Sequence, residues 1–231
     1  MELLDLMRRR QSSRAEFDPA HPVPDACLDR ILEAARWAPT AHNMQNFEIV
    51  VIDDRAILEK IAAIRSRPSA VFLHENYLQL SFSDEELRQR GTGLLATMFP
   101  PSWRVPGASP DETVDGEHAF LGTSLRHCPT LALVLYDRRK RAPASEGDVL
   151  GVMSLGCVMQ NMWLMAEALG LSLQILSTLG TPEVEEQVRR ILAIPDHMAV
   201  GFACRLGHPV GPARYARVRR ALDRFVHRNR Y

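Results

Sequence analysis

The sequence predicts a domain of mixed α and β structure. Patterns typical of amphipathic helices alternate with short apolar runs typical of strands in both halves of the chain. The 231 residues are 46% hydrophobic, which is enough for a sizeable core, and no internal repeat interrupts the pattern. We therefore expect a single domain over residues 1–231, with an inserted segment at about residues 67–126.

The first half of the chain predicts three helices and one strand. We expect the helices over Glu2–Arg9, Asp25–Trp37 and Arg55–Arg65, and the strand over Phe47–Ile52. In the second helix the apolar residues recur three and four positions apart, which places them on one face. Asp25 follows a proline and is expected to be the N-cap of that helix.

The second half predicts strands and helices in alternation. Strands are expected over Thr130–Tyr136, Leu171–Leu176 and Met198–Leu206, and helices over Val149–Ala166 and from Glu183 onward. The helix over Val149–Ala166 is apolar enough to raise the question of a membrane span. A helix buried in a core, or one packed across a subunit interface, explains its composition better, and we favour the interface.

The middle of the chain carries a different composition. Ser83, with Glu86 three positions later, predicts a capped helix over Ser83–Arg90. The following stretch, residues 91–110, is rich in Gly, Pro and aromatic residues. A loop this long inside a domain is typically a lid or a pocket wall, and a surface elaboration is the alternative.

Charge and cysteine content exclude several partners. Lys plus Arg and Asp plus Glu each total 28, so the balance favours neither nucleic acid nor a membrane surface. The N-terminus has acidic residues before any apolar run, so we expect a short helix there, no signal peptide, and a cytoplasmic protein. The cysteines form no CxxC pair and are expected to be reduced core residues: Cys27, Cys128, Cys157 and Cys204.

Two polar segments are candidates for ligand binding. Arg10-Gln-Ser-Ser-Arg14 places two guanidinium groups around two hydroxyls, a donor set that suits a phosphate monoester. The helix-to-strand junction Ala38–Asp54 offers amides and hydroxyls that could hold a planar polar ligand, or could simply be a polar connection. Basic residues also crowd the C-terminus, so the two ends could share one anion or could be solvated tails.

The sequence lacks the common nucleotide-binding and catalytic motifs. The sequence contains no GxGxxG, GxxxxGK[ST], GxSxG or HExxH, and its eight histidines are scattered singly. His42, in the junction, could touch a ligand, whereas the other histidines are better explained as structural or surface residues. We therefore expect no metal site, and an enzyme of this kind would take its chemistry from a cofactor.

Six segments in this order resemble the FMN-dependent nitroreductase family. They are RRRQSSRAEF, ILEAARWAPTAHNMQNFEIVVIDD, HCPTLALVLYD, LGCVMQNMWLMAEALGLSLQI, AVGFACRLGHP and RVRRALDRFVHRNRY. The resemblance covers both ends of the chain and most of its second half. Many members have Pro-Ser and Gln-Pro-Trp where this chain has Pro39-Thr40 and Gln45-Asn46-Phe47.

The resemblance implies an α+β fold, a central mixed and largely antiparallel sheet flanked by helices, in a homodimer with an exchanged C-terminal arm. It also implies the residues that bind FMN at the dimer interface. The phosphate- and flavin-binding N-terminal segment is Arg10, Gln11, Ser12 and Arg14. The loop contributed by the partner subunit is Pro39, Thr40, Ala41, Asn43 and Gln45. The turn against the flavin ring is Leu176, Ser177 and Thr178, and the C-terminal phosphate contacts are Arg217 and Arg219.

The activity that the resemblance implies is a ping-pong oxidoreductase cycle. NADPH or NADH would reduce the flavin and leave, and a nitroaromatic, a quinone or a similar electron-poor small molecule would then be reduced. Two alternatives stay open. One is an FMN-dependent dehydrogenase or oxidase of a specific metabolite, which the enlarged middle segment favours. The other is a flavin-binding protein without catalysis.

Overall fold

The computed structural model describes residues 2–66, 75, 79–96, 120–143, 145–211 and 217–231. The chain forms two compact units. The first consists of Met1–Arg65 and Ala119–Ala213, and the second of Ser66–His118 and Arg214–Tyr231. The single domain with an insertion at about residues 67–126 stays a prediction.

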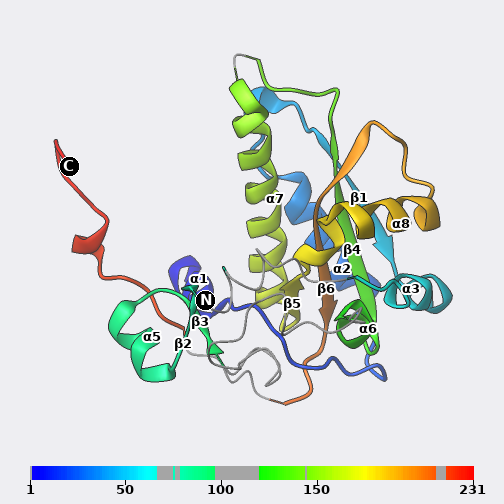
Figure 1. The fold of residues 1–231 in the computed structure, drawn as a ribbon, viewed down its shortest axis with the longest axis horizontal. Helices are drawn as coiled ribbons and strands as arrows, with labels where there is room; N and C mark the ends of the chain where they lie inside the picture. The colour runs from blue at the N-terminus through cyan, green and yellow to red at the C-terminus, as the bar shows by residue number, and fades with distance from the viewer. Residues whose placement is uncertain (1, 67–74, 76–78, 97–119, 144, 212–216) are drawn as a thin grey trace. The chain divides into compact units, whose positions relative to one another are not determined.

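A four-stranded sheet lies at the centre of the first unit (Figure 1). Its strands are β1 (Phe47–Ile52), β4 (Thr130–Asp137), β6 (Met198–Gly207) and β5 (Ser172–Ile175), in that order across the sheet. Each neighbouring pair is antiparallel, with one register shift between Val134 and Leu135 of β4. The predicted largely antiparallel sheet is confirmed.

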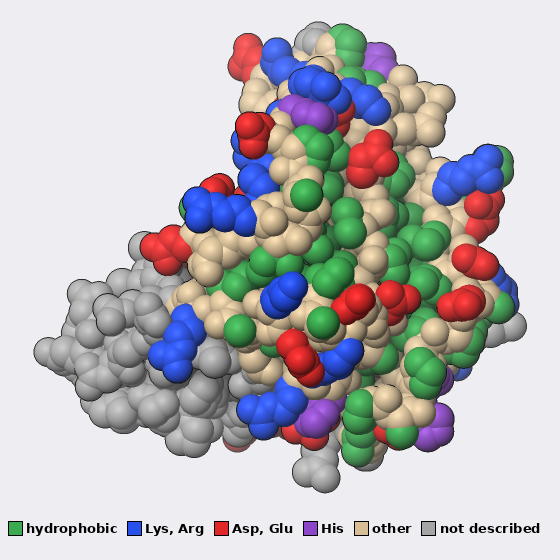
Figure 2. Space-filling view, turned by 90° about the vertical axis from the view of Figure 1, so that its right-hand side faces the viewer, with side chains coloured by type: hydrophobic (Ala, Val, Ile, Leu, Met, Phe, Trp, Pro, Cys, Tyr) green, Lys and Arg blue, Asp and Glu red, His purple; other side chains and the backbone are tan. Residues whose placement is uncertain are grey.

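Side chains alternate between the two faces of the sheet, and each face carries its own core. Leu131 and Leu133 of β4 point to the face covered by α3 (Arg55–Ala62), α6 (Phe120–Leu125) and α8 (Pro182–Leu192). On the side where α3 and α8 lie, hydrophobic side chains gather at the centre with charged ones around them (Figure 2).

The opposite face packs against α2 (Asp25–Arg36) and α7 (Val149–Ala168). Ala132 and Val134 of β4 point toward these helices, because they alternate with the leucines of the other face. The first unit therefore has three layers, with the sheet between two sets of helices. The predicted flanking helices are confirmed.

Helix α7 is long and apolar enough to cross a membrane by length and composition. Part of it is core: Val158, Met162 and Ala166 are fully buried against α2 and the sheet. Its first turns are different, because the apolar side chains of Val149, Leu150, Val152 and Met153 are exposed. A helix that is apolar on its open side fits the predicted packing across a subunit interface.

The helix boundaries agree with the sequence to within a few residues, with one error. Asp25 was expected as the N-cap of α2, but Pro24 occupies that position and Asp25 is the first helical residue, without a capping bond. An aspartate there still interacts favourably with the positive end of the helix. Helix α1 spans Leu3–Arg9, and α3 is capped by Asp54, which accepts from Ala56 and Ile57.

The second unit contains the predicted capped helix. Helix α5 (Asp84–Arg90) begins with a capping box in which Ser83 and Glu86 accept from each other's backbone amide. Strands β2 (Ser81–Phe82) and β3 (Leu94–Leu95) pair beside it in parallel. Of the predicted lid or pocket wall, residues 97–110 lie outside the described residues.

Short 3-10 turns complete the described elements. They are η1 (Ala41–Asn43), η5 (Glu146–Asp148), η6 (Ser177–Gly180) and η7 (Leu222–Arg224).

All four cysteines are free thiols; Cys128 and Cys204 are buried as predicted, whereas Cys27 and Cys157 are only partly buried. Burial raises the pKa of Cys128 to about 11 and the pKa of Cys204 to about 12. These two thiols are therefore protonated and unreactive at neutral pH.

Candidate functional site

The N-terminal segment leaves α1 at Arg10 and runs along the free edge of β5. Ser12 forms a bridge with Leu173, and the Ser13 amide donates to the Leu173 carbonyl at 3.1 Å. Side chains alternate on an extended segment, and Ser13 points inward with only 1% of its surface exposed. Ser12 and Arg14 therefore lie on the opposite, outer side, where a ligand can reach them.

The start of this segment is held by the C-terminal half of α7. The indole Nε1 of Trp163 donates to the Gln11 carbonyl at 3.1 Å. The guanidinium of Arg10 stacks over the Trp163 ring at 4.2 Å from its centroid. One turn further along α7, Glu167 forms an ion pair with Arg9 at 3.4 Å.

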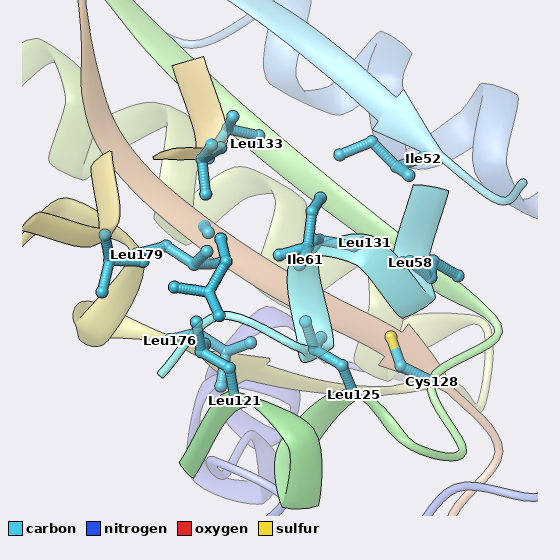
Figure 3. Packing of buried hydrophobic residues seen from close by; sticks show 14 of the residues in the cluster. Ile52, Leu58, Ile61, Leu121, Leu125, Cys128, Leu131, Leu133, Leu176 and Leu179 are labelled. Carbon is cyan, nitrogen blue, oxygen red and sulfur yellow. The ribbon is translucent and has the colours of Figure 1, made fainter. Parts of the chain in front are cut away.

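The predicted ring-contacting turn follows β5 directly and packs against β6 and α8. Ser177 is exposed and Thr178 is partly exposed, within η6. The Leu176 side chain instead points into the core with Leu121 and Leu179 (Figure 3). Its amide donates to the Ala203 carbonyl at 2.8 Å, which leaves no donor at Leu176 for a flavin.

The predicted partner loop, Pro39–Gln45, lies at the other end of α7. The Ala41 amide donates to Ser154 Oγ at 2.9 Å, near the start of that helix. Ser154 and Trp163 are nine residues apart in sequence, or about 14 Å along the helix axis. Within one chain the loop and the N-terminal segment are therefore separate (Figure 1).

The backbone of this loop is strained and internally bonded. His42, Asn43 and Gln45 have φ of 51°, 51° and 46°, in the left-handed region that side chains disfavour. The Gln45 amide donates to Thr40 Oγ1, and Gln45 Nε2 donates to Asn43 Oδ1, both at 3.1 Å. Such strain is found more often at binding sites than in simple connections, which favours the ligand-binding interpretation.

The loop also ends on an unsatisfied polar group. The side chain of Asn46 is 2% exposed, and its Oδ1 has no hydrogen-bond partner among the residues that the structure describes. An amide oxygen buried in this way carries a desolvation cost. Asn46 occupies the position at which many members of the nitroreductase family have the proline of Gln-Pro-Trp.

Two predicted site residues belong to the second unit. Arg217 and Arg219 are exposed, and Arg219 donates to the Val218 carbonyl at 2.7 Å. Their meeting with Arg10 on one phosphate stays a prediction. In the described part of the chain no group of His, Cys, Asp and Glu could hold a metal ion.

Arg205 is a residue of this region that the sequence analysis missed. It lies on β6 with 5% of its surface exposed and donates to the Ala15 carbonyl at 2.7 Å. An arginine between apolar neighbours in a predicted strand, as in ACRLG, could have indicated it, since buried arginines need specific acceptors. Trp163 was missed because a tryptophan in an apolar helix is usually a core residue.

The model of the Nitroreductase family matches residues 7–208 of this sequence. The chain belongs to the nitroreductase family. Among curated proteins, an NADPH-dependent oxidoreductase of Staphylococcus aureus is 23% identical over 211 residues, which are 91% of this chain and 67% of the relative.

Solved structures of the nitroreductase family share the fold. A nitroreductase family protein from Clostridium difficile 630 superposes with a TM-score of 0.65 at 17% identity over the whole of both chains. An FMN-dependent nitroreductase from Clostridium difficile R20291 has a TM-score of 0.61 at 17% identity, over 99% of each chain. A nitroreductase with bound FMN from Bacteroides fragilis has a TM-score of 0.53 at 20% identity, over 91% of this chain and 89% of the other.

Proposed function

We propose that this nitroreductase-family chain is an NAD(P)H-dependent FMN oxidoreductase. It reduces nitroaromatic, quinone or similar electron-poor acceptors with ping-pong kinetics. Family membership supports the class of enzyme, and the names of the Staphylococcus relative and of the FMN-dependent neighbours support the donor and the cofactor. The observation that carries the proposal is the N-terminal segment, which presents Ser12 and Arg14 outward from the edge of β5.

The residues of this segment fit the phosphate of FMN. A phosphate monoester accepts hydrogen bonds and carries negative charge, and Arg10, Ser12 and Arg14 offer two guanidinium groups and a hydroxyl. The flat face of the Arg10 guanidinium stacks on the Trp163 ring. The N–H groups lie along the edge of the guanidinium, so the stacking contact does not use them as donors. When bound, FMN supplies the redox chemistry, so the chain needs no nucleophile of its own.

Five further predicted residues orient the flavin. Thr40, Asn43 and Gln45 offer hydroxyl and amide groups from a loop whose backbone is already fixed. A preformed loop loses little conformational freedom on binding, which favours affinity. Ser177 and Thr178, in the turn that follows β5, offer two further hydroxyls.

We infer a homodimer in which a second copy contributes the loop to the flavin, as the family resemblance implies. The loop is attached to Ser154 and the phosphate segment to Trp163, about 14 Å apart along α7, which is consistent with a loop that serves the partner's site. Exposed apolar residues on the first turns of α7 provide a surface for the second copy. Toward the other end of α7 in the same unit, the C-terminal half of that helix lines an apolar hollow of about 450 Å³ with α1 and α2, and the hollow includes Leu3, Trp37 and Met165.

The second copy is the occupant that we propose for this hollow and for the α7 surface. Trp37 is 73% exposed in the single chain, and burying an aromatic side chain of that size is a large gain on association. The exchanged C-terminal arm and a cytoplasmic location are further parts of the proposal, and both come from the resemblance and the sequence.

The test begins with the visible absorbance spectrum of the purified protein, with and without added FMN. Anaerobic addition of NADPH and then NADH should bleach the flavin bands, and a quinone or nitroaromatic should restore them. Initial rates at several acceptor concentrations should give parallel double-reciprocal lines.

Each contrary outcome has its own meaning. A protein that takes up no FMN would overturn the proposal. FMN that stays oxidised with excess donor would favour the flavin-binding protein without catalysis. Rapid oxygen uptake with no added acceptor would favour the oxidase.

A further inference from the structure

We propose that Trp163 and Arg205 are positioning residues that hold the N-terminal segment Arg10–Ala15 from two sides. The inference rests on the proposed function, because it takes that segment as the binding site for the phosphate of FMN. Neither side chain is proposed to touch the flavin. Each acts by fixing the backbone from which Arg10, Ser12 and Arg14 project.

Trp163 holds the first part of the segment. Its indole N–H donates to the carbonyl of Gln11, and its ring supports the guanidinium of Arg10 at 4.2 Å. One side chain thus fixes both the backbone between two binding residues and the side chain of one of them. Trp163 itself is partly buried in α7, a helix that the core holds in place through Met162 and Ala166.

Arg205 holds the last part of the segment. Its guanidinium donates to three acceptors from three different elements: Ala15 O at 2.7 Å, Ser124 O of α6 at 3.0 Å and Gln174 Oε1 of β5 at 2.6 Å. Its head also lies 4.4 Å from the centroid of the Phe17 ring. Only an arginine presents its donors in a fixed planar fork that can serve such a set at once.

The packing around Phe17 restricts the segment further. Phe17 is fully buried, and it bridges Pro209 just after β6. A Cβ at Gly207 would lie 2.8 Å from the Phe17 ring, so glycine at this position allows the close approach. The segment from Gln11 to Phe17 is therefore held in turn by Trp163 of α7, Leu173 of β5, Arg205 of β6 and Pro209 just after β6.

The consequence for binding is preorganisation. A segment that is already ordered does not lose conformational freedom when an anion binds, whereas a released segment must be ordered at that moment. Release would weaken binding of the phosphate more than binding of the isoalloxazine ring. FMN and riboflavin differ only in that phosphate, so the two ligands separate positioning from general damage.

The experiment compares dissociation constants for FMN and riboflavin, measured by fluorescence titration of the full chain. Trp163→Phe keeps a ring beneath Arg10 and removes the donor to Gln11. We expect the FMN dissociation constant to rise about tenfold, as for loss of one hydrogen bond that orders a charged site, and that of riboflavin to change within about twofold.

Arg205 is tested by a graded pair of variants. Arg205→Lys keeps the charge but cannot serve all three acceptors, and Arg205→Met removes the donors at similar volume. We expect FMN affinity to fall in the order wild type, Lys, Met, again with little change for riboflavin. If Arg205→Met does not fold, Trp163→Phe and Arg205→Lys carry the test.

Ile52→Ala is the matched control. Ile52 is 2% exposed and ends β1, the edge strand opposite β5, so its loss destabilises the core away from the segment. The Ile52→Ala variant should have a lower thermal midpoint of unfolding, and the ratio of its FMN and riboflavin dissociation constants should equal that of wild type. Suppose that wild type binds FMN. If the ratio of the FMN and riboflavin dissociation constants is then the same in Trp163→Phe and Arg205→Lys as in wild type, the inference is overturned. Failure of wild type to bind FMN would instead overturn the proposed function.

Discussion

At Asn43 the backbone and the side chain have separate roles. Its φ of 51° is tolerated by asparagine and glycine but disfavours alanine, while its Oδ1 accepts from Gln45. Whether Asn43 shapes the loop or binds the flavin is therefore open to a test with two substitutions at one position.

We predict that Asn43→Ala lowers the free energy of unfolding by about 1 kcal/mol, because of the left-handed backbone. Asn43→Gly should leave it within about 0.5 kcal/mol of wild type. Flavin affinity should fall in both, because both lose the carboxamide. Urea denaturation and FMN titration measure the two effects, and wild-type FMN affinity in Asn43→Gly would limit Asn43 to a structural role.

The basic residues at the two ends of the chain give a second prediction at this scale. Replacing Arg10 and Arg219 together by alanine should weaken FMN binding by roughly two orders of magnitude and leave the chain folded, because each removes a charge-assisted donor. The control is the double variant Arg55→Ala and Arg190→Ala, which removes the same charge from exposed i, i+4 pairs on α3 and α8. Equal FMN affinity in the two double variants would remove the phosphate assignment.

Among the elements, β4 ends in an ion pair between a buried carboxylate and a largely exposed arginine. Asp137 is 4% exposed, and Arg139 donates to both of its carboxylate oxygens at 3.1 Å. These hydrogen bonds lower the pKa of Asp137 to about 2, from an ordinary value of 3.8. Because the pKa is lower in the folded state, the stabilisation is complete above pH 4 and is lost as the pH falls toward 2.

We predict that Asp137→Asn is less stable than wild type at neutral pH, and that the difference shrinks between pH 4 and pH 2. Urea midpoints at pH 6, 4, 3 and 2.5 would measure it. Glu59→Gln is the control, since Glu59 pairs with Arg55 on the exposed side of α3 and should change stability little at any pH. A difference between Asp137→Asn and wild type that stays constant with pH would contradict the assignment.

For the whole molecule, the exposed apolar start of α7 is the feature that a single chain leaves unexplained. Val152 and Met153 are each 61% exposed on a helix whose other side is core. Exposed apolar residues grouped on one element are characteristic of interfaces.

We predict that Val152→Asp with Met153→Asp gives a monomer that has lost most of its FMN affinity, because desolvating two carboxylates opposes association. Sedimentation velocity and FMN titration measure this. Val152→Ile with Met153→Leu keeps the surface apolar and should remain a dimer. A double-aspartate variant that is still dimeric, or a monomer with full FMN affinity, would refute the shared site.

The sequence predicted most of the elements because their patterns are local. The continuous apolar run of β4, the apolar spacing of α2 and the capping box at Ser83 are each decided by neighbours in the chain. The N-cap at Asp25 was wrong because Pro24 already has the extended backbone of a cap residue, so the helix begins at Asp25 itself. Helix α6 was not predicted, since six residues give too little periodicity to recognise.

By itself, the sequence determined the fold class, the family resemblance and the donor set of Arg10–Arg14, because these depend on residue type and order. Only the tertiary structure decided where those donors lie. It placed the segment on the edge of β5 between Trp163 and Arg205, turned Leu176 into the core, and put the Asn43 loop at the far end of α7. These are contacts between residues far apart in the chain, such as Gln11 with Trp163, and no local pattern encodes them.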